Sequence, residues 1–355
     1  MNDLHFSVSV GINDYPTFNK LNHAVSDAKE FHQWVCHPQG GNVPAANAEL
    51  VCGPDPLPDD WGPLSAKPQL NEVLHHLKRF RGQVEDAVRD DPDAWKRTRL
   101  YLFCSGHGIA PSANDAALLL ANADREEPGY NLSCGKLQEW FQQAQSFQEL
   151  VFFADCCRER IPGAPESWLP WLERKGHNGQ VRWLLGCATY FGDYAHEERG
   201  EDAPPDERRG YFTRALMDGL RGAAADTRTR RVTANRLADY VQRRVLHATA
   251  DRARPQRPTM PFAEDFVVCR VDEVKRASFN VTLVFPSGYQ GRVELVGDSD
   301  VFSVEISGDA GREKSMTLEE GIYQVLSVEP PDGADPFRTD DGKFLVVKEG
   351  QRVEL

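Results

Sequence analysis

The sequence has few of the features that mark membrane, secreted or zinc-stabilised proteins. No apolar run approaches the roughly 18 residues that a membrane helix requires. Asp3 and His5 interrupt the first ten residues, where a secretory signal would need an unbroken apolar stretch. The 8 cysteines are irregularly spaced and include no Cys-x-x-Cys pair, which argues against a disulfide framework and a structural zinc site. We therefore expect a cytoplasmic protein with reduced thiols and no membrane partner.

Positive charge is also scarce. The chain has 41 lysines and arginines against 54 acidic residues, so its formal net charge is -13, whereas a general nucleic-acid binder needs a basic surface. Residues 206–258 do contain 13 arginines and no lysine. However, Arg236, Arg243 and Arg244 fall off the apolar stripe of their helical stretch, which fits a solvated helix face. We do not expect nucleic acid as a partner.

What the sequence does contain is enough apolar material for about two domains, since 40% of its 355 residues are hydrophobic. Residues 277–355 have a net charge of -8 and a period of two that is typical of short strands separated by turns. We expect these strands at residues 279–285, 292–296, 301–306, 321–328 and 343–347. The pattern predicts a small all-β, sandwich-like accessory domain at 276–355 that follows a larger domain at 1–275.

The first 275 residues alternate between apolar strands and stretches of helical period. The strands are expected at residues 6–12, 100–104, 150–154 and 181–187, and the helices at 24–35, 70–88, 137–144 and 233–245, the last with Thr233 as its N-cap. Continuous apolar strands between helices predict an α/β fold with a largely parallel sheet covered on both faces. Chemistry in such folds gathers beyond the carboxyl ends of the strands.

Two of these strand ends carry reactive side chains. Residues 105–108 (Ser-Gly-His-Gly) place His107 in a glycine turn, and residues 155–157 (Asp-Cys-Cys) end another strand. A histidine and a thiol at neighbouring strand ends can form a Cys/His pair, in which the imidazole assists thiolate formation and later protonates a leaving amine. Taken singly, each has a simpler interpretation, because strand-end cysteines are often buried and a histidine in a glycine turn is often only a turn residue.

On these residues the chain resembles the caspase-like cysteine peptidases, and most closely their metacaspase-type bacterial branch. The resemblance covers almost all of residues 5–270: the first strand and its loop at 8–15, a Ser-Asp-Ala segment at 26–28, and the two motifs above. Later blocks at 193–197 and 210–216 also match. The interval of 50 residues between His107 and Cys157 is close to that of caspases.

The resemblance implies that Cys157 is the nucleophile of a cysteine endopeptidase and His107 its acid/base partner. The backbone N–H groups of Gly108 and Cys157 would form the oxyanion hole. Cys156 is expected in the core, because adjacent side chains of a strand point to opposite faces.

The resemblance further implies a substrate pocket lined by Asp27, Asp155 and Ser105. Two carboxylates in one cleft repel each other, and a substrate cation relieves that repulsion. We expect cleavage after basic residues, with Arg preferred over Lys because its planar fork meets a carboxylate through two hydrogen bonds. The simpler alternative for Asp27 is an aspartate that stabilises the start of a helix.

The chain departs from the family pattern at three points, one of which is Ala24, where the family has a further cysteine. Residues 158–160 are Arg-Glu-Arg where the family has His-Ser-Gly, and residues 110–123 contain only Asp115 where calcium-activated relatives have an acidic run. We expect neither a metal nor another cofactor. Two stretches rich in turn-forming residues, 158–180 and 197–210, are candidates for activating cleavage, or else ordinary solvated loops.

Three classes of function remain open. The first is a regulated cysteine endopeptidase acting on protein substrates, which family analogy connects with bacterial defence or cell suicide. For this class an activating protease or another partner protein could bind through the C-terminal β-domain. The second is a catalytically weak caspase-like scaffold that acts through partner binding by the acidic β-domain. The third is an α/β ligand-binding protein whose Cys/His pair is incidental.

Overall fold

The computed structural model covers most of the chain. It describes residues 2–161, 163–165, 167, 169–171, 179–195, 210–272, 274, 278–297, 301–306, 312–328, 343–346 and 350–355. Much of the candidate cleavage stretch 158–180, and all of 197–210 except Gly210, lies outside these residues. None of the helices in the described part combines the length and the apolar character of a membrane-spanning segment.

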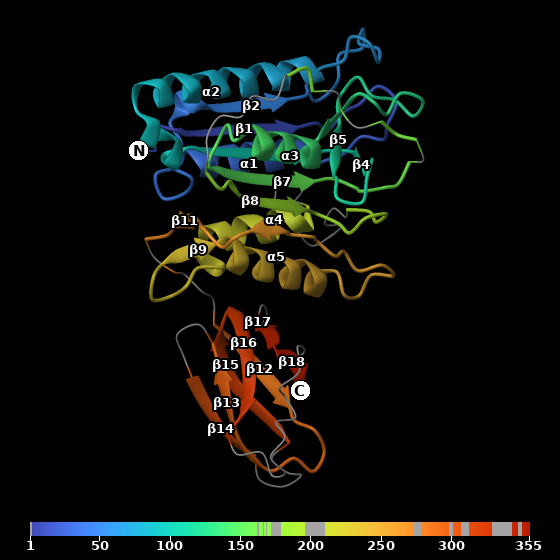
Figure 1. The fold of residues 1–355 in the computed structure, drawn as a ribbon. Helices are drawn as coiled ribbons and strands as arrows, with labels where there is room; N and C mark the ends of the chain where they lie inside the picture. Colours follow the sequence, from blue (N-terminus) through green and yellow to red (C-terminus); the bar gives the residue numbers. More distant parts are fainter. Residues whose placement is uncertain are drawn as a thin grey trace.

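A six-stranded sheet forms the centre of the fold, with strand order β10-β8-β7-β3-β1-β2. Its members are β1 (His5–Gly11), β2 (Ala48–Cys52), β3 (Arg99–Ser105), β7 (Glu149–Asp155), β8 (Arg182–Cys187) and β10 (Phe262–Ala263). All neighbouring pairs are parallel except β10 with β8. The arrows of the parallel strands in Figure 1 point toward the side where β4 and β5 lie, so their carboxyl ends form one edge.

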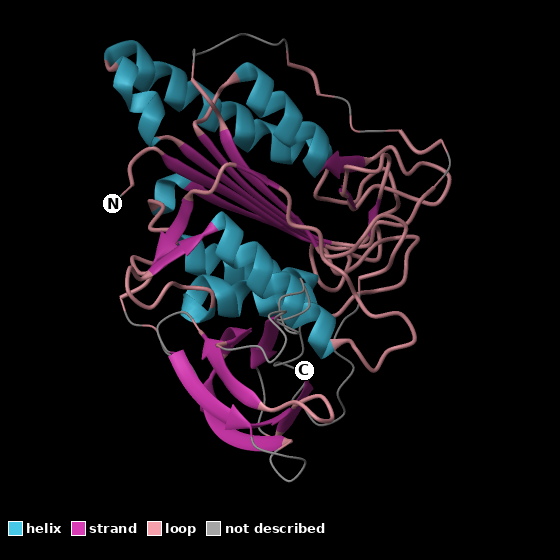
Figure 2. Ribbon diagram, turned by 60° about the horizontal axis from the view of Figure 1, so that its bottom comes forward, coloured by secondary structure: helices cyan, strands magenta, loops and turns pink. Residues whose placement is uncertain are grey.

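Helices cover both faces of this sheet. They are α1 (Ala24–Cys36), α2 (Leu70–Asp90), α3 (Cys134–Ala144), α4 (Tyr211–Asp218) and α5 (Ala234–Ala248). Three shorter helices are η1 (Ala45–Asn47), η2 (Pro92–Arg97) and η3 (Gly219–Ala223). One core joins the sheet to α2 and α3, and a second joins it to α1, α4 and α5. Figure 2 shows these two layers on opposite sides of the strands. The four predicted helices are confirmed, and Thr233 caps α5 by accepting a hydrogen bond from the Arg236 N–H.

Short strands complete this part of the chain. The three-stranded sheet of β4 (Gly108–Ile109), β5 (Ala117–Leu119) and β6 (Asn131–Ser133) follows directly from β3, at the carboxyl edge of the central sheet. A second small sheet pairs β9 (Arg231–Thr233) with β11 (Val267–Arg270).

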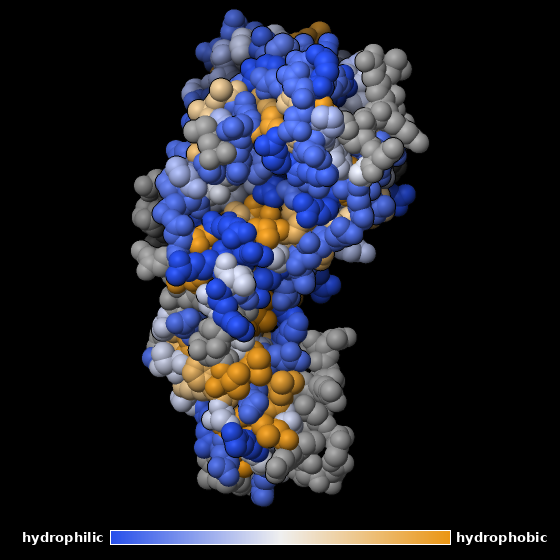
Figure 3. All heavy atoms as spheres, turned by 60° about the vertical axis from the view of Figure 1, so that its left-hand side comes forward, coloured by the Kyte–Doolittle hydropathy of each residue, from blue (hydrophilic) through white to orange (hydrophobic). Residues whose placement is uncertain are grey.

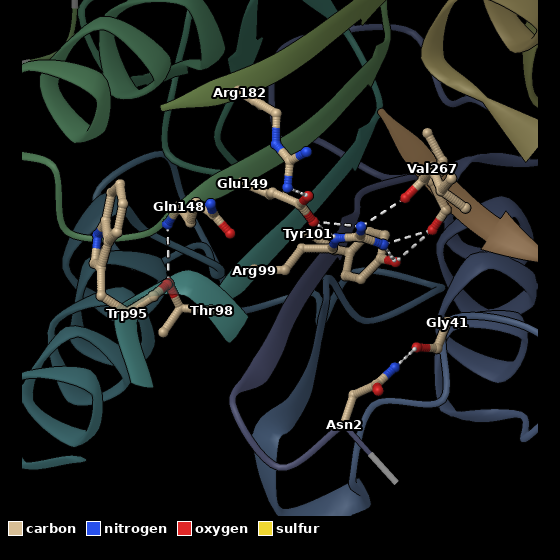
Figure 4. A network of polar contacts seen from close by, with 11 residues as sticks. Asn2, Gly41, Trp95, Thr98, Arg99, Tyr101, Gln148, Glu149, Arg182 and Val267 are labelled. Carbon is tan, nitrogen blue, oxygen red and sulfur yellow. Dashed lines mark hydrogen bonds and ion pairs between the residues drawn. The ribbon is translucent and has the colours of Figure 1, made fainter. Parts of the chain in front are cut away.

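A buried polar network ties the amino ends of the central strands to β11 (Figure 4). The Arg99 guanidinium donates to the Glu149 carboxylate at 2.6 Å, to the Tyr101 hydroxyl at 2.8 Å and to the Val267 carbonyl at 2.7 Å. Arg182 forms a second ion pair with Glu149. The network therefore stabilises β3, β7, β8 and β11 together, at the opposite end of the strands from His107 and Cys157.

The C-terminal segment forms two antiparallel-rich sheets with a core of their own. The sheets are β15-β12-β18 and β14-β13-β16-β17. Their strands are β12 (Ser278–Val284), β13 (Gly291–Val296), β14 (Val301–Ile306), β15 (Glu313–Glu319), β16 (Gly321–Ser327), β17 (Lys343–Val346) and β18 (Gln351–Glu354). Val281, Leu295 and Val325 are among the residues that fill the space between them. The predicted fold class, a largely parallel α/β sheet followed by β-sheets, is confirmed.

The two parts of the chain touch through α5 and the turn between β15 and β16. The Tyr240 hydroxyl donates to the Glu320 carboxylate at 2.9 Å. Apolar side chains gather on the C-terminal sheets in the face that Figure 3 shows, and Val301 of β14 is among the exposed apolar residues. The boundary expected near residue 275 falls at residues outside the described part and stays a prediction.

Candidate active site

The register of two neighbouring strands brings the predicted Cys/His pair together. β3 and β7 run parallel with an offset of 50 residues, so Ser105 lies opposite Asp155. The same offset persists beyond the strands, where Ile109 bridges Glu159. His107 and Cys157 lie midway between these two paired positions, so they occupy matching places on adjacent segments.

The imidazole of His107 is held by the loop that follows β1. Its Nε2 lies 2.6 Å from the carbonyl oxygen of Asn19, and its ring packs against those of Tyr15 and Phe18, with centroids 5.0 and 5.4 Å away. A carbonyl oxygen only accepts hydrogen bonds, so Nε2 carries the proton in the neutral ring and Nδ1 holds the lone pair. A base oriented by a third group in this way is the arrangement that activates a thiol.

The backbone at His107 is fixed as firmly as its side chain. The His107 N–H donates to the Tyr15 hydroxyl at 3.1 Å, and that hydroxyl donates to the Leu119 carbonyl at 3.1 Å. Tyr15 is fully buried beneath the turn, and burial raises its pKa well above the ordinary range, so the hydroxyl stays protonated. Tyr15 ends the matched stretch 8–15, but the sequence assigns it no role, and Phe18 and Asn19 appear there as ordinary loop residues.

The two adjacent cysteines point in different directions. Cys156 is buried in the core, and burial is the main reason why the pKa of its thiol lies well above the usual value. Cys157 is only half-buried, and its Sγ accepts a hydrogen bond from the Ala195 N–H at 3.4 Å. The expectation that Cys156 is a core residue is confirmed.

Gly108 lies against the cysteine pair so closely that no side chain fits there. A Cβ at this position would lie 2.5 Å from the Cys156 Sγ and 2.7 Å from the Cys157 carbonyl oxygen. The backbones of the two segments therefore meet at Gly108 and Cys157, the two residues expected to supply oxyanion donors.

The three residues expected to bind substrate are all buried near the same strand ends. The exposed fractions are 2% for Asp27, 7% for Asp155 and 3% for Ser105. A Cβ on Gly210 would lie 2.5 Å from an Asp155 oxygen and 3.5 Å from an Asp27 oxygen, so both carboxylates approach one point. Asp27 also lies in the first turn of α1, as its simpler interpretation predicted.

The Asp155 carboxylate is anchored by α4. Its Oδ2 accepts hydrogen bonds from the Thr213 N–H at 3.1 Å and the Thr213 hydroxyl at 2.6 Å. Thr213 fixes this carboxylate in place, and only its position within the matched block at 210–216 could have drawn attention to it.

Comparison with known proteins gives one curated relative and several solved structures. No family model matches the chain. A protein named as a probable protease from a Desulfuromonadales bacterium is 28% identical over 229 residues, which cover 61% of this chain but only 26% of that relative. The match thus spans about a quarter of the relative's length.

Two solved structures are similar at lower identity. A Geobacter sulfurreducens protein matches with a TM-score of 0.37 and 14% identity, covering 73% of this chain and 93% of that chain. Caspase-1 from Spodoptera frugiperda matches with a TM-score of 0.40 and 14% identity, covering 73% and 89%.

No metal-binding group appears among the described residues. Asp115, the acidic residue of the 110–123 stretch, caps α3 instead. Its carboxylate accepts hydrogen bonds from the Gly135 N–H at 2.8 Å and the Ser133 hydroxyl at 2.5 Å. This carboxylate therefore contributes to the start of a helix.

Proposed function

We propose that the chain is a cysteine endopeptidase that cleaves proteins after basic residues through the dyad of Cys157 and His107. The observation that carries this proposal is the register that sets the two residues opposite each other, with His107 oriented by the Asn19 carbonyl. Similarity to a protein named as a probable protease supports the same class of reaction.

The first half of the reaction forms an acyl-enzyme. The Cys157 thiol gives its proton to Nδ1 of His107, and the thiolate attacks the scissile carbonyl carbon. The resulting oxyanion accepts hydrogen bonds from the backbone N–H groups of Gly108 and Cys157. Collapse of the tetrahedral intermediate breaks the C–N bond, and His107 donates its proton to the departing amine.

The second half releases the acid. Water enters in place of the amine and gives a proton to His107 as its oxygen attacks the thioester. The C–S bond then breaks, and the thiolate recovers a proton from the imidazolium. Because the Asn19 carbonyl holds Nε2–H throughout, Nδ1 remains the nitrogen that exchanges protons with substrate.

Specificity for a basic residue follows from the two carboxylates at Gly210. Asp27 and Asp155 together favour a cation, with the Ser105 hydroxyl as a further acceptor. A guanidinium donates in parallel to carboxylate oxygens, whereas an ammonium is a point charge, so we expect Arg to be cleaved faster than Lys.

The same contact supports regulation. A Cβ on Gly210 would lie 2.5 Å from an Asp155 oxygen, so the Gly210 backbone lies close to this carboxylate. We infer that a substrate guanidinium would need the same space. We infer that this conformation is a resting state and that a trigger or a proteolytic cut displaces the start of α4. A zymogen of this kind would suit a defence or cell-suicide role, in which a protease that is already present in the cell must stay inactive until it is triggered.

An arginyl fluorogenic peptide tests the proposed activity, with lysyl and aspartyl peptides for comparison. Cys157→Ala should abolish turnover, because it removes the attacking thiolate. The matched variant Cys156→Ala should keep most of it, because that thiol is buried in the core. Turnover that survives Cys157→Ala, or that depends on Cys156 instead, would contradict the assignment. The absence of turnover before and after limited trypsin cleavage would contradict the peptidase proposal itself.

A further inference from the structure

Arg158, the residue directly after Cys157, is buried although it carries a full positive charge, with only 3% of its surface exposed. Its guanidinium makes four hydrogen bonds. The acceptors are the Asp115 carbonyl at 2.9 Å, the Thr189 carbonyl at 3.1 Å, the Ala113 carbonyl at 2.6 Å and the Thr259 hydroxyl at 3.2 Å. A buried cation requires such bonds, because leaving it unsatisfied would cost on the order of several kcal/mol.

The acceptors come from three separate stretches of the chain. Ala113 and Asp115 lie between β4 and β5, Thr189 follows β8, and Thr259 precedes β10. All four acceptors are neutral, and no ion pair joins Arg158 to an acidic side chain of the described residues. The planar fork of five N–H donors can satisfy acceptors in several directions at once, which a lysine ammonium cannot do in the same geometry.

The backbone at Arg158 is held on both sides as well. The Arg158 N–H donates to the Asp193 carbonyl at 3.0 Å, and the Arg158 carbonyl accepts from the Gly192 N–H at 2.9 Å. On the other side, the Glu159 carbonyl accepts from the Ala110 N–H at 2.9 Å. The segment that carries Cys157 thus lies between two neighbouring loops, and the Arg158 guanidinium fixes it to the interior below.

We propose that Arg158 is a positioning residue that holds the Cys157 thiol at the right distance from His107, by fastening the nucleophile segment to residues 113–115, 189 and 259. The proposal rests on the peptidase function proposed above. It gives a role to the point where this chain departs from the His-Ser-Gly of the family it resembles. A misplacement of about 1 Å in such a pair can cost about 100-fold in rate.

The experiment measures how fast Cys157 is alkylated, because that rate reports the thiolate without any need for peptide turnover. Iodoacetamide labelling is followed by peptide mapping in a Cys156→Ala background, so that one thiol of the labelled peptide reacts. Arg158→Ala is compared with Arg158→Lys, and with Arg158→Ala in the presence of methylguanidinium, which can occupy the vacated site. Where peptide turnover is measurable, kcat and KM for the arginyl peptide are determined in parallel.

The matched control is Arg236→Ala. Arg236 also donates to two backbone carbonyls, those of Ala224 and Ala225, but it lies on α5 away from the strand ends. Arg236 also pairs with Asp226 at 3.8 Å. The variant therefore reports what the loss of a carbonyl-bound arginine distant from the strand ends does to stability. Thermal unfolding of every variant shows whether a change in alkylation occurs in folded protein.

We expect Arg158→Ala to slow alkylation of Cys157. The same substitution should lower kcat by about 100-fold. KM should change little, because the carboxylate pocket is intact. Methylguanidinium should restore much of the alkylation rate, Arg158→Lys should be intermediate, and Arg236→Ala should be unaffected. Wild-type alkylation in folded Arg158→Ala, or equal losses in the Arg236 control, would overturn the proposal.

Two further outcomes separate this inference from the proposed function. If the wild-type protein cleaves no peptide while Arg158→Ala still slows alkylation, the positioning role stands and the peptidase proposal fails. If Arg158→Ala does not fold, Arg158→Lys decides the question: slower alkylation supports the role, and a wild-type rate contradicts it.

Discussion

At the scale of single residues, burial separates groups that look equivalent in the sequence. Cys156 and Cys157 are neighbours, yet one thiol lies in the core with a raised pKa and the other is half-exposed just beyond the end of β7. The alternation of side chains along a strand is enough to predict that only one of them faces the site. Their order along the chain, together with the family resemblance, then favours Cys157 as the candidate nucleophile.

A substitution at Asp27 tests the expected substrate pocket. Asp27→Asn should lower kcat/KM for an arginyl peptide by about 10- to 100-fold, since a hydrogen bond to a charged group is worth about 1.5–3 kcal/mol. The loss should appear mainly in KM and should be smaller for uncharged substrates. Steady-state kinetics with both substrates provides the measurement.

Glu30→Gln is the control for that substitution. Glu30 lies one turn further along α1, is also buried and pairs with Arg221 at 2.6 Å. It should change stability without changing KM. Equal effects of the two variants on KM would mean that Asp27 only supports the helix.

Other residues of the site have no signature that a sequence displays. The acceptors of Arg158 lie between 31 and 101 residues away along the chain. The carbonyl that orients His107 belongs to Asn19, and any residue type could supply a carbonyl. Such roles depend on tertiary contacts, so the sequence indicates the candidate reacting groups but not the groups that hold them.

At the scale of secondary structure elements, the central strands are stabilised at one end and carry the site at the other. The amino ends of β3, β7 and β8 meet in the network of Arg99, Glu149 and Arg182, which also reaches β11. Their carboxyl ends carry His107 and Cys157. Stability and chemistry can therefore be perturbed separately.

Glu149→Gln tests the stabilising end. The substitution leaves two arginines without their common carboxylate, and breaking a buried pair costs about 3–5 kcal/mol. We expect a fall of about 3 kcal/mol in the free energy of unfolding, measured with urea. The surface substitution Asp86→Asn, which breaks the exposed pair with Arg89, should cost less than about 1 kcal/mol. Equal losses in the two variants would show that the network contributes no more than a surface pair.

In the central sheet, the inner strands could be predicted, and the edge strands β2 and β10 could not. β3 and β7 are buried throughout and appear as continuous apolar runs. β2 is an edge strand with a mostly half-buried pattern, and β10 spans two residues. β15, with the sequence EKSMTLE, was missed for the same reason, because its exposed positions carry charged and polar side chains.

At the scale of the whole molecule, the chain has two cores around the parallel sheet and a third between the C-terminal sheets. Near residue 275 the sequence changes from apolar strands between helical stretches to short strands with a period of two, and this change predicts such a division. The net charge of -8 in residues 277–355 marks the second part as acidic. Residues 259–270 fold back and pair with β8 and β9, and nothing in the sequence predicts this pairing. It depends on edges that only the folded sheet presents.

Covalent labelling tests the central claim most directly. A peptide chloromethyl ketone ending in arginine is incubated with the protein before and after limited trypsin cleavage, and the adduct is located by peptide mapping. We predict a single thioether on Cys157, absent in His107→Ala and not formed by the matching aspartyl reagent. Labelling at a different cysteine, or equal labelling by the aspartyl reagent, would contradict a Cys157/His107 peptidase with a pocket for basic residues.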